Sequence, residues 1–225
     1  MRALLRYELE FLVRSRRWLP PFLVYALVMG IGVESGQPVL DSLGFGAALL
    51  VPVTAWYARC CLTAEPAAAR ACVAAVVGPR RVQLAQLLAA LVAGVVLAVL
   101  GIAGVWLLGG PPASGGRPVG AGPVLVAGVL GSLAAVLTGL GAGALCNRPV
   151  LRSPAYGIPL SLGLSVALLV ATGSPANAAI RALVAGASTG RLGQPVLPLL
   201  GAAVFAAAAV WVAVALAGRG SEAPA

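Results

Sequence analysis

Long apolar runs without charge dominate the chain and predict helices that cross a membrane. A charged residue at the centre of a bilayer costs roughly 2.5–3.5 kcal/mol on insertion scales, so an uncharged run marks a span. Six such runs occur, at residues 18–33, 42–58, 82–108, 119–146, 153–172 and 194–217. A span needs about 20 residues, so the first two runs are short and their ends should reach into the interface. The pattern predicts an all-α membrane protein with six transmembrane helices, in one domain that covers residues 1–225.

The placement of arginine predicts the orientation of these spans. All 15 basic residues are arginine. With the N-terminus inside, Arg117, Arg181 and Arg191 lie outside and the other 12 lie in the cytoplasm. Excess arginine in short cytoplasmic loops is the positive-inside signature. We therefore expect a multi-pass protein of the bacterial cytoplasmic membrane with both termini in the cytoplasm.

Composition supports the membrane class and limits the chemistry. Hydrophobic residues make up 60% of the chain and charged residues 9%, whereas soluble domains carry about 25% charged residues. The net charge of +9 comes mainly from arginines that flank apolar runs, which favours a lipid partner and no nucleic acid. Without lysine or histidine the chain has neither a phosphate-binding loop nor histidine-based catalysis. We expect no enzyme activity and no catalytic, cofactor or metal site in this chain.

Four cysteines occur, and the predicted topology places all of them on the reducing cytoplasmic side. They are Cys60, Cys61, Cys72 and Cys146. Disulfides are not expected in that compartment. Cys-x-x-Cys pairs and histidines are both absent, so these residues are interpreted as small apolar side chains near helix ends.

The segment MRALLRYELEFLVRSRRW predicts an amphipathic helix that lies on the inner leaflet. Arg2, Arg6, Glu10 and Arg14 repeat every four residues, so Arg6–Glu10 and Glu10–Arg14 can pair. A second face carries Leu5, Leu9 and Leu12. Arginines beside an apolar face suit anionic headgroups.

A second cytoplasmic helix is expected over residues 63–77, between the second and third spans. Thr63 is the predicted N-cap, Glu65 suits the positive helix end, and Gly78-Pro79 stops the helix. Its apolar stripe is formed by Cys72, Val73, Val76 and Val77. An exposed apolar stripe on a short helix needs cover from a partner or from the bundle.

Small residues and one short apolar segment each leave two interpretations open. Gly139 and Gly143 form a G-x-x-x-G pair, which serves packing within the chain or a dimer face. Residues 173–193 are placed outside and contain AIRALVAGA. That piece is too short to span, so it is expected to be either interfacial or re-entrant.

Several of these features together resemble the permease subunits of type-2 ABC exporters, of the actinobacterial kind. The segment RYELEFLVRSRRWLPP leads into the first span, AWYAR ends the second, and VVGPRRVQLAQLL opens the third. The resemblance covers nearly the whole chain and lies in the arrangement more than in the letters. It implies a permease without ATPase motifs. Since no acidic residue lies inside a predicted span, a pore without charged lining favours an apolar or amphipathic substrate.

The resemblance also implies partners and residue roles. A separate ATPase subunit would hold ATP and Mg²⁺, and a second permease chain, identical or related, would complete a dimer. The residues implied in coupling to the ATPase are Glu65, Arg70, Gly78, Pro79, Arg80 and Arg81. Those implied in the interfacial helix are Arg14, Arg16 and Arg17.

Two other classes remain open at this point. One is the substrate-binding membrane subunit of a vitamin-uptake system, which also has about six spans and no ATPase motif. The other is a non-transporting scaffold or immunity protein, which would have no ATPase partner. The arginine-rich amphipathic start argues against the first.

Overall fold

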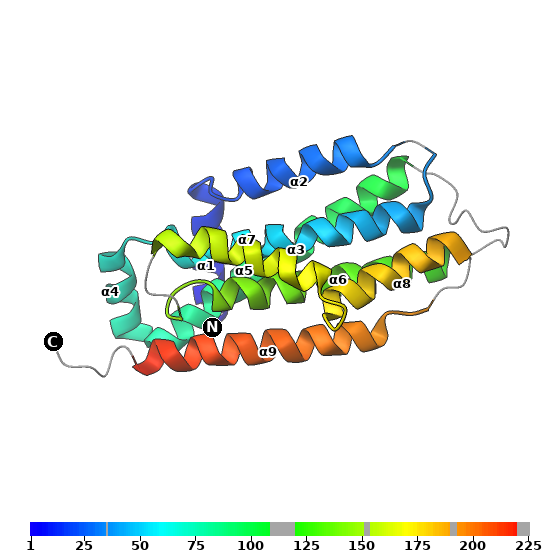
Figure 1. Cartoon of the computed structure of the whole chain (residues 1–225). Coiled ribbons are helices and arrows are strands. Elements are labelled where there is room, and N and C mark those ends of the chain that lie inside the picture. Colours follow the sequence, from blue (N-terminus) through cyan, green and yellow to red (C-terminus); the bar gives the residue numbers. More distant parts are fainter. Residues whose placement is uncertain (35, 109–119, 151–153, 190–192, 220–225) are drawn as a thin grey trace.

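A computed structural model describes residues 1–34, 36–108, 120–150, 154–189 and 193–219 (Figure 1). These residues form nine α-helices and no strand. The helices are α1 (Arg2–Arg14), α2 (Leu19–Gly32), α3 (Val39–Ala64), α4 (Ala67–Val77), α5 (Pro79–Leu108), α6 (Ala121–Leu145), α7 (Pro154–Val170), α8 (Pro175–Thr189) and α9 (Val196–Arg219).

Four of the described helices are long and apolar enough to cross a membrane, namely α3, α5, α6 and α9. The pair α7 and α8 is bent by 49° and adds a fifth span if the two are taken together. Helix α2 has 14 residues and rises only about 21 Å, less than the roughly 30 Å hydrocarbon core. The chain is therefore an all-α, multi-pass membrane protein, but the prediction of six full spans is wrong.

The differences from the predicted spans have local physical causes. The second span was expected to end at residue 58, whereas α3 continues to Ala64. Arg59, the charged residue that follows the predicted end, is accommodated because its Nη1 donates a hydrogen bond of 3.1 Å to Asn147 Oδ1. The helix expected to start at Thr63 begins at Ala67 instead, after an extended Glu65 and Pro66.

Helices α3 and α6 form the centre of the bundle and pack against each other most extensively. Their glycines make that contact close. A Cβ on Gly143 would lie 2.5 Å from Ala58 Cβ, and a Cβ on Gly139 would overlap the carbonyl of Val51. The G-x-x-x-G pair thus serves packing within the chain.

Residues 173–193 were expected to form an external connection with an interfacial or re-entrant piece. Instead, α8 packs against α3, α6, α7 and α9. It buries Ala176, Ala179 and Leu183 completely. In Figure 1, α8 continues in the general direction of α7 toward the far end of the bundle. The bend of 49° between α7 and α8 is compatible with a broken span or with a re-entrant loop.

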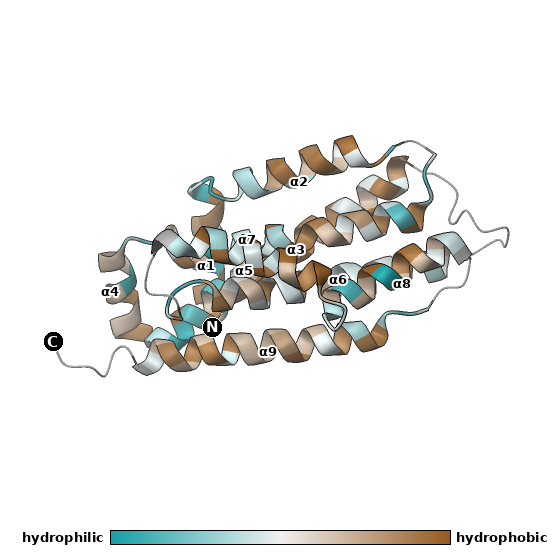
Figure 2. Cartoon of the chain, in the orientation of Figure 1, coloured by the Kyte–Doolittle hydropathy of each residue, from teal (hydrophilic) through white to brown (hydrophobic). Residues whose placement is uncertain are grey.

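Many polar residues lie at one end of the bundle. Helices α1 and α4 lie there together with the C-terminal part of α9 (Figure 1). Figure 2 shows hydrophilic residues around α1 and its junction with α2, and apolar residues along α2, α5 and α9. Arg117, Arg152 and Arg191, used in the predicted orientation, lie outside the described residues.

Candidate functional site at the α1 and α4 end of the bundle

Helix α4 projects from this end with little cover. Its 11 residues include none that is buried, and Val76 is 86% exposed. Among the described elements it packs against α5 alone. The predicted stripe is present but uneven, because Cys72 and Val76 are exposed while Val73 and Val77 are half-buried.

A tight turn sets the angle between α4 and α5. Gly78 ends α4 with φ +92°, and its N–H donates to the carbonyl of Ala74 at 2.8 Å. This left-handed conformation favours glycine. Pro79 then opens α5, where its missing N–H is one of the groups that a first helical turn leaves unpaired.

Glu65 and Arg70, two of the predicted coupling residues, are tied to the bundle. Glu65 is buried, and its Oε1 accepts a hydrogen bond of 2.7 Å from the Tyr7 hydroxyl on α1. Arg70 Nη1 donates to the carbonyl of Leu62 at 3.2 Å. Both residues therefore fix the start of α4 from within.

Arg80 and Arg81, also predicted as coupling residues, differ in their contacts. Both side chains are exposed, but Arg80 lies against Gly218 of α9, where a Cβ would overlap its guanidinium. Arg80 is thus a contact between α5 and α9. Arg81 is the better candidate for contact with another protein.

The interfacial helix is confirmed as amphipathic. Leu12 is buried, Leu5 and Leu9 pack against the core, and α1 contacts α3 and α5. Arg6 Nε pairs with Glu10 Oε1 at 2.8 Å. This is the one ion pair within the described residues, so the expected Glu10–Arg14 pair is not formed.

The arginines at the end of α1 have different roles. Arg14 is exposed in the last turn, and Arg16 adopts φ 55° in the turn to α2. Arg17 Nη1 donates to the carbonyl of Thr63 at 2.7 Å. With Arg70 on Leu62, two guanidinium groups thus satisfy carbonyls in the last turn of α3, where helix geometry leaves acceptors unpaired and negative.

A buried acidic cluster under α1 was missed by the sequence analysis. Glu8 is 3% exposed, Glu65 is 6% exposed and Gln86 on α5 is 1% exposed. Glu8 Oε1, Glu65 Oε2 and both amide atoms of Gln86 have no hydrogen-bond partner among the described residues. The spacing does contain a signal, since Glu8 falls between Leu5 and Leu12 on the apolar face of α1.

The cluster alters the acidity of two side chains on α1. Burial, followed by the negative charge of Glu65, raises the pKa of Glu8 to about 7, while the Gln86 amide opposes the shift. The hydrogen bond to Glu65, together with burial, raises the pKa of Tyr7 to about 12. Near neutral pH, Glu8 is therefore poised between its neutral and charged forms.

All four cysteines are free thiols, as expected, and Cys72 on α4 is the exposed one. No group of three or more acidic, cysteine or histidine residues in the described part of the chain could hold a metal ion. No protein family, curated protein or solved structure matches the chain.

Proposed function

We propose that this chain is the permease subunit of an ATP-binding-cassette exporter, driven by a separate ATPase subunit that holds ATP and Mg²⁺. The observation that carries the proposal is α4. It is a helix without a buried residue, held at its start by Glu65 and Arg70 and at its end by Gly78. A projecting helix fixed at both ends can transmit a push from a partner into α3 and α5.

Charge and topology support the same proposal. Arg14 and Arg81 are exposed at this end of the bundle, which we place in the cytoplasm because arginine gathers there. The substrate would be apolar or amphipathic, because the long helices carry charged residues only near their ends. A second permease chain, identical or related, would complete the pathway.

Two substitutions on α4 test the proposal. Val76→Glu places a charge on the exposed apolar stripe, and Ala71→Glu places the same charge on the opposite side of the helix. Each tagged variant is purified from native membranes in mild detergent. Bound subunits are identified by mass spectrometry, and ATP hydrolysis by the purified sample is measured.

We expect an ATP-binding-cassette subunit and vanadate-sensitive ATP hydrolysis with wild type and Ala71→Glu, and at least tenfold less of both with Val76→Glu. Arg81→Glu should act like Val76→Glu. Intact wild-type protein that purifies without any such ATPase would contradict the proposal and favour the scaffold or immunity class.

A further inference from the structure

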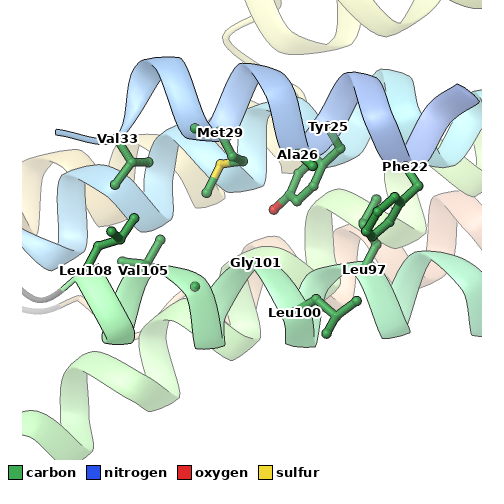
Figure 3. Close-up of a pocket in the computed structure, with 12 residues that line it drawn as sticks. Phe22, Tyr25, Ala26, Met29, Val33, Leu97, Leu100, Gly101, Val105 and Leu108 are labelled. Atoms are coloured by element: carbon green, nitrogen blue, oxygen red, sulfur yellow. The ribbon is translucent and has the colours of Figure 1, made fainter. Parts of the chain in front are cut away.

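A groove runs along the outside of the bundle between α2 and α5 (Figure 3). It encloses about 320 Å³, which lies within the range of roughly 300–1,000 Å³ typical of ligand pockets. It extends along α2 from Phe22 to Val33, a rise of about 17 Å. Its length suits an extended hydrocarbon chain.

The walls of the groove are apolar, and its flanks face outward. Leu27 on α2 is 65% exposed and Leu100 on α5 is 51% exposed. Gly30 and Gly104 line the groove, and a Cβ on either glycine would meet no atom within 4 Å. The two glycines therefore keep the space between the helices open.

One polar group is directed into this apolar space. Tyr25 is 4% exposed, and its hydroxyl points from α2 toward Gly101 on α5 (Figure 3). The rest of the Tyr25 side chain adds an aromatic face to the apolar wall of the groove.

The end of the groove far from α1 is polar and acidic. A crevice shares Val33, Val105 and Leu108 with the groove and is also lined by Glu34 and Gln37. Glu34 and the nearby Asp41 are exposed, and neither forms an ion pair with a described residue. The apolar groove thus ends beside exposed carboxylates that form no ion pair among the described residues.

From this geometry we infer that the groove binds a membrane amphiphile, with its hydrocarbon chain along Tyr25 and Gly104 and a cationic amine headgroup at Glu34. Apolar walls that open toward the bilayer favour a hydrocarbon chain, and the exposed carboxylate of Glu34 at one end favours a positive head. The inference goes beyond the proposed function, because binding requires neither an ATPase nor transport.

The test uses the full chain in phosphatidylcholine nanodiscs with a photoactivatable hexadecylamine probe. Labelled peptides are located by mass spectrometry. The variant Gly30→Leu/Gly104→Leu places two side chains in the groove at positions where a Cβ meets no atom within 4 Å, and Gly163→Leu is the control, because Gly163 on α7 also has open space around its Cβ. Circular dichroism and elution volume verify the fold, and Gly104→Leu alone replaces the double variant if that one misfolds.

We expect labels on α2 and α5 in wild type and Gly163→Leu, and at least a tenfold loss in the groove variant. Equal labelling of all three proteins would overturn the site. So would cross-links between two copies of the chain from a cysteine at residue 104, because the groove would then be a subunit interface.

The headgroup is tested with Glu34→Gln and a matched alcohol probe of the same chain length. We expect two- to fivefold weaker labelling by the amine, roughly the value of an exposed ion pair, and no change with the alcohol. Equal labelling of wild type by amine and alcohol would overturn the assignment of a cationic head.

Discussion

Glu8 is the residue at which local pattern and tertiary structure conflict most clearly. It occupies an apolar position of α1 and has no hydrogen-bond partner for Oε1 among the described residues. An unpaired buried carboxylate opposes the docking of α1 on the bundle unless it is protonated. The acid therefore makes this contact sensitive to pH.

Replacement of Glu8 by Gln should stabilise the protein at high pH. The pKa of about 7 in the folded protein lies above the ordinary value of 4.5 for this carboxyl, so wild type loses stability as the pH rises from about 4.5 to 7. Glu8→Gln removes this loss, and its advantage should grow over that window and stay constant above it. Thermal melting in detergent should show a rise of about 2–4 °C per kcal/mol gained.

The control for this prediction is Glu10→Gln on the exposed face. Its ion pair with Arg6 is worth at most about 1 kcal/mol, so the change in melting temperature should be small. An advantage of Glu8→Gln that is equal at pH 5 and pH 8 would contradict the buried, neutral form of Glu8.

Gly139 tests the contact between α3 and α6. A Cβ there would overlap the carbonyl of Val51 and lie 3.0 Å from Thr54 Cβ, so Gly139→Ala should cost about 1–3 kcal/mol. Gly163→Ala, at an open helical position, should be neutral or stabilise by up to about 1 kcal/mol. Unfolding in mixed micelles measures both. If Gly139→Ala changed only dimerisation, the glycine would belong to a dimer face.

At the scale of elements, α4 differs from the helices around it. The whole of α4 lacks buried residues and packs only on α5 among described elements. Local opening should therefore require little free energy. We expect its amides to exchange hydrogen at least a hundredfold faster than those of α3 in the isolated protein, and to slow when the ATPase binds. Exchange as slow as in α3 would show that α4 is already covered.

The break between α7 and α8 is a second element with its own stabilising contact. Asn177 Nδ2 donates to the carbonyl of Leu169, near the end of α7. Asn177→Ala leaves that carbonyl without this donor, so unfolding should be about 1–2 kcal/mol easier. By comparison, Asn147 Nδ2 donates to the carbonyl of Gly143 in the last turn of α6, only four residues away in the sequence. An unfolding free energy unchanged by Asn177→Ala would show that the contact adds nothing.

The sequence predicted those helices whose bounds coincide with the bounds of an uncharged apolar run. The runs at 82–108, 119–146 and 194–217 lie within three residues of α5, α6 and α9 at each end. The prediction was less accurate where contacts between helices determine the bounds or the placement of a helix. Arg59, hydrogen-bonded to Asn147, lies inside α3 beyond the predicted end at residue 58. The run at 18–33 matches α2 within one residue at each end but is too short for a full span. The apolar piece in residues 173–193 was predicted to be interfacial or re-entrant, and its packing as α8 depends on contacts with α3, α6, α7 and α9.

The candidate site was predicted in position but not in detail. Gly78 and Pro79 were correctly identified as the end of α4, because their backbone preferences are local. Contacts over long sequence separations could not be read from spacing, such as Tyr7 with Glu65 and Arg17 with Thr63. The same holds for the buried atoms of Glu8, Glu65 and Gln86 that lack a hydrogen-bond partner among the described residues. Their burial depends on how α1 packs on the bundle.

At the scale of the whole molecule, the native Cys72 reports orientation. It is the exposed cysteine of the four, on the end that we place in the cytoplasm. A membrane-impermeant maleimide should label it in inside-out vesicles and not in intact cells. A Cys72→Ser protein with Asp41→Cys should show the reverse, because Asp41 is exposed at the far end. Labelling of native Cys72 in intact cells would invert the proposed topology.

The coupling role of α4 is the central claim, and photo-crosslinking in intact membranes tests it most directly. A benzophenone amino acid is placed at residue 76, on the exposed stripe, and at residue 71, on the opposite side, as the matched control. We predict an adduct with an ATP-binding-cassette subunit from residue 76 and at least tenfold less from residue 71. Correctly inserted protein that forms no adduct with such a subunit from residue 76 would contradict the claim.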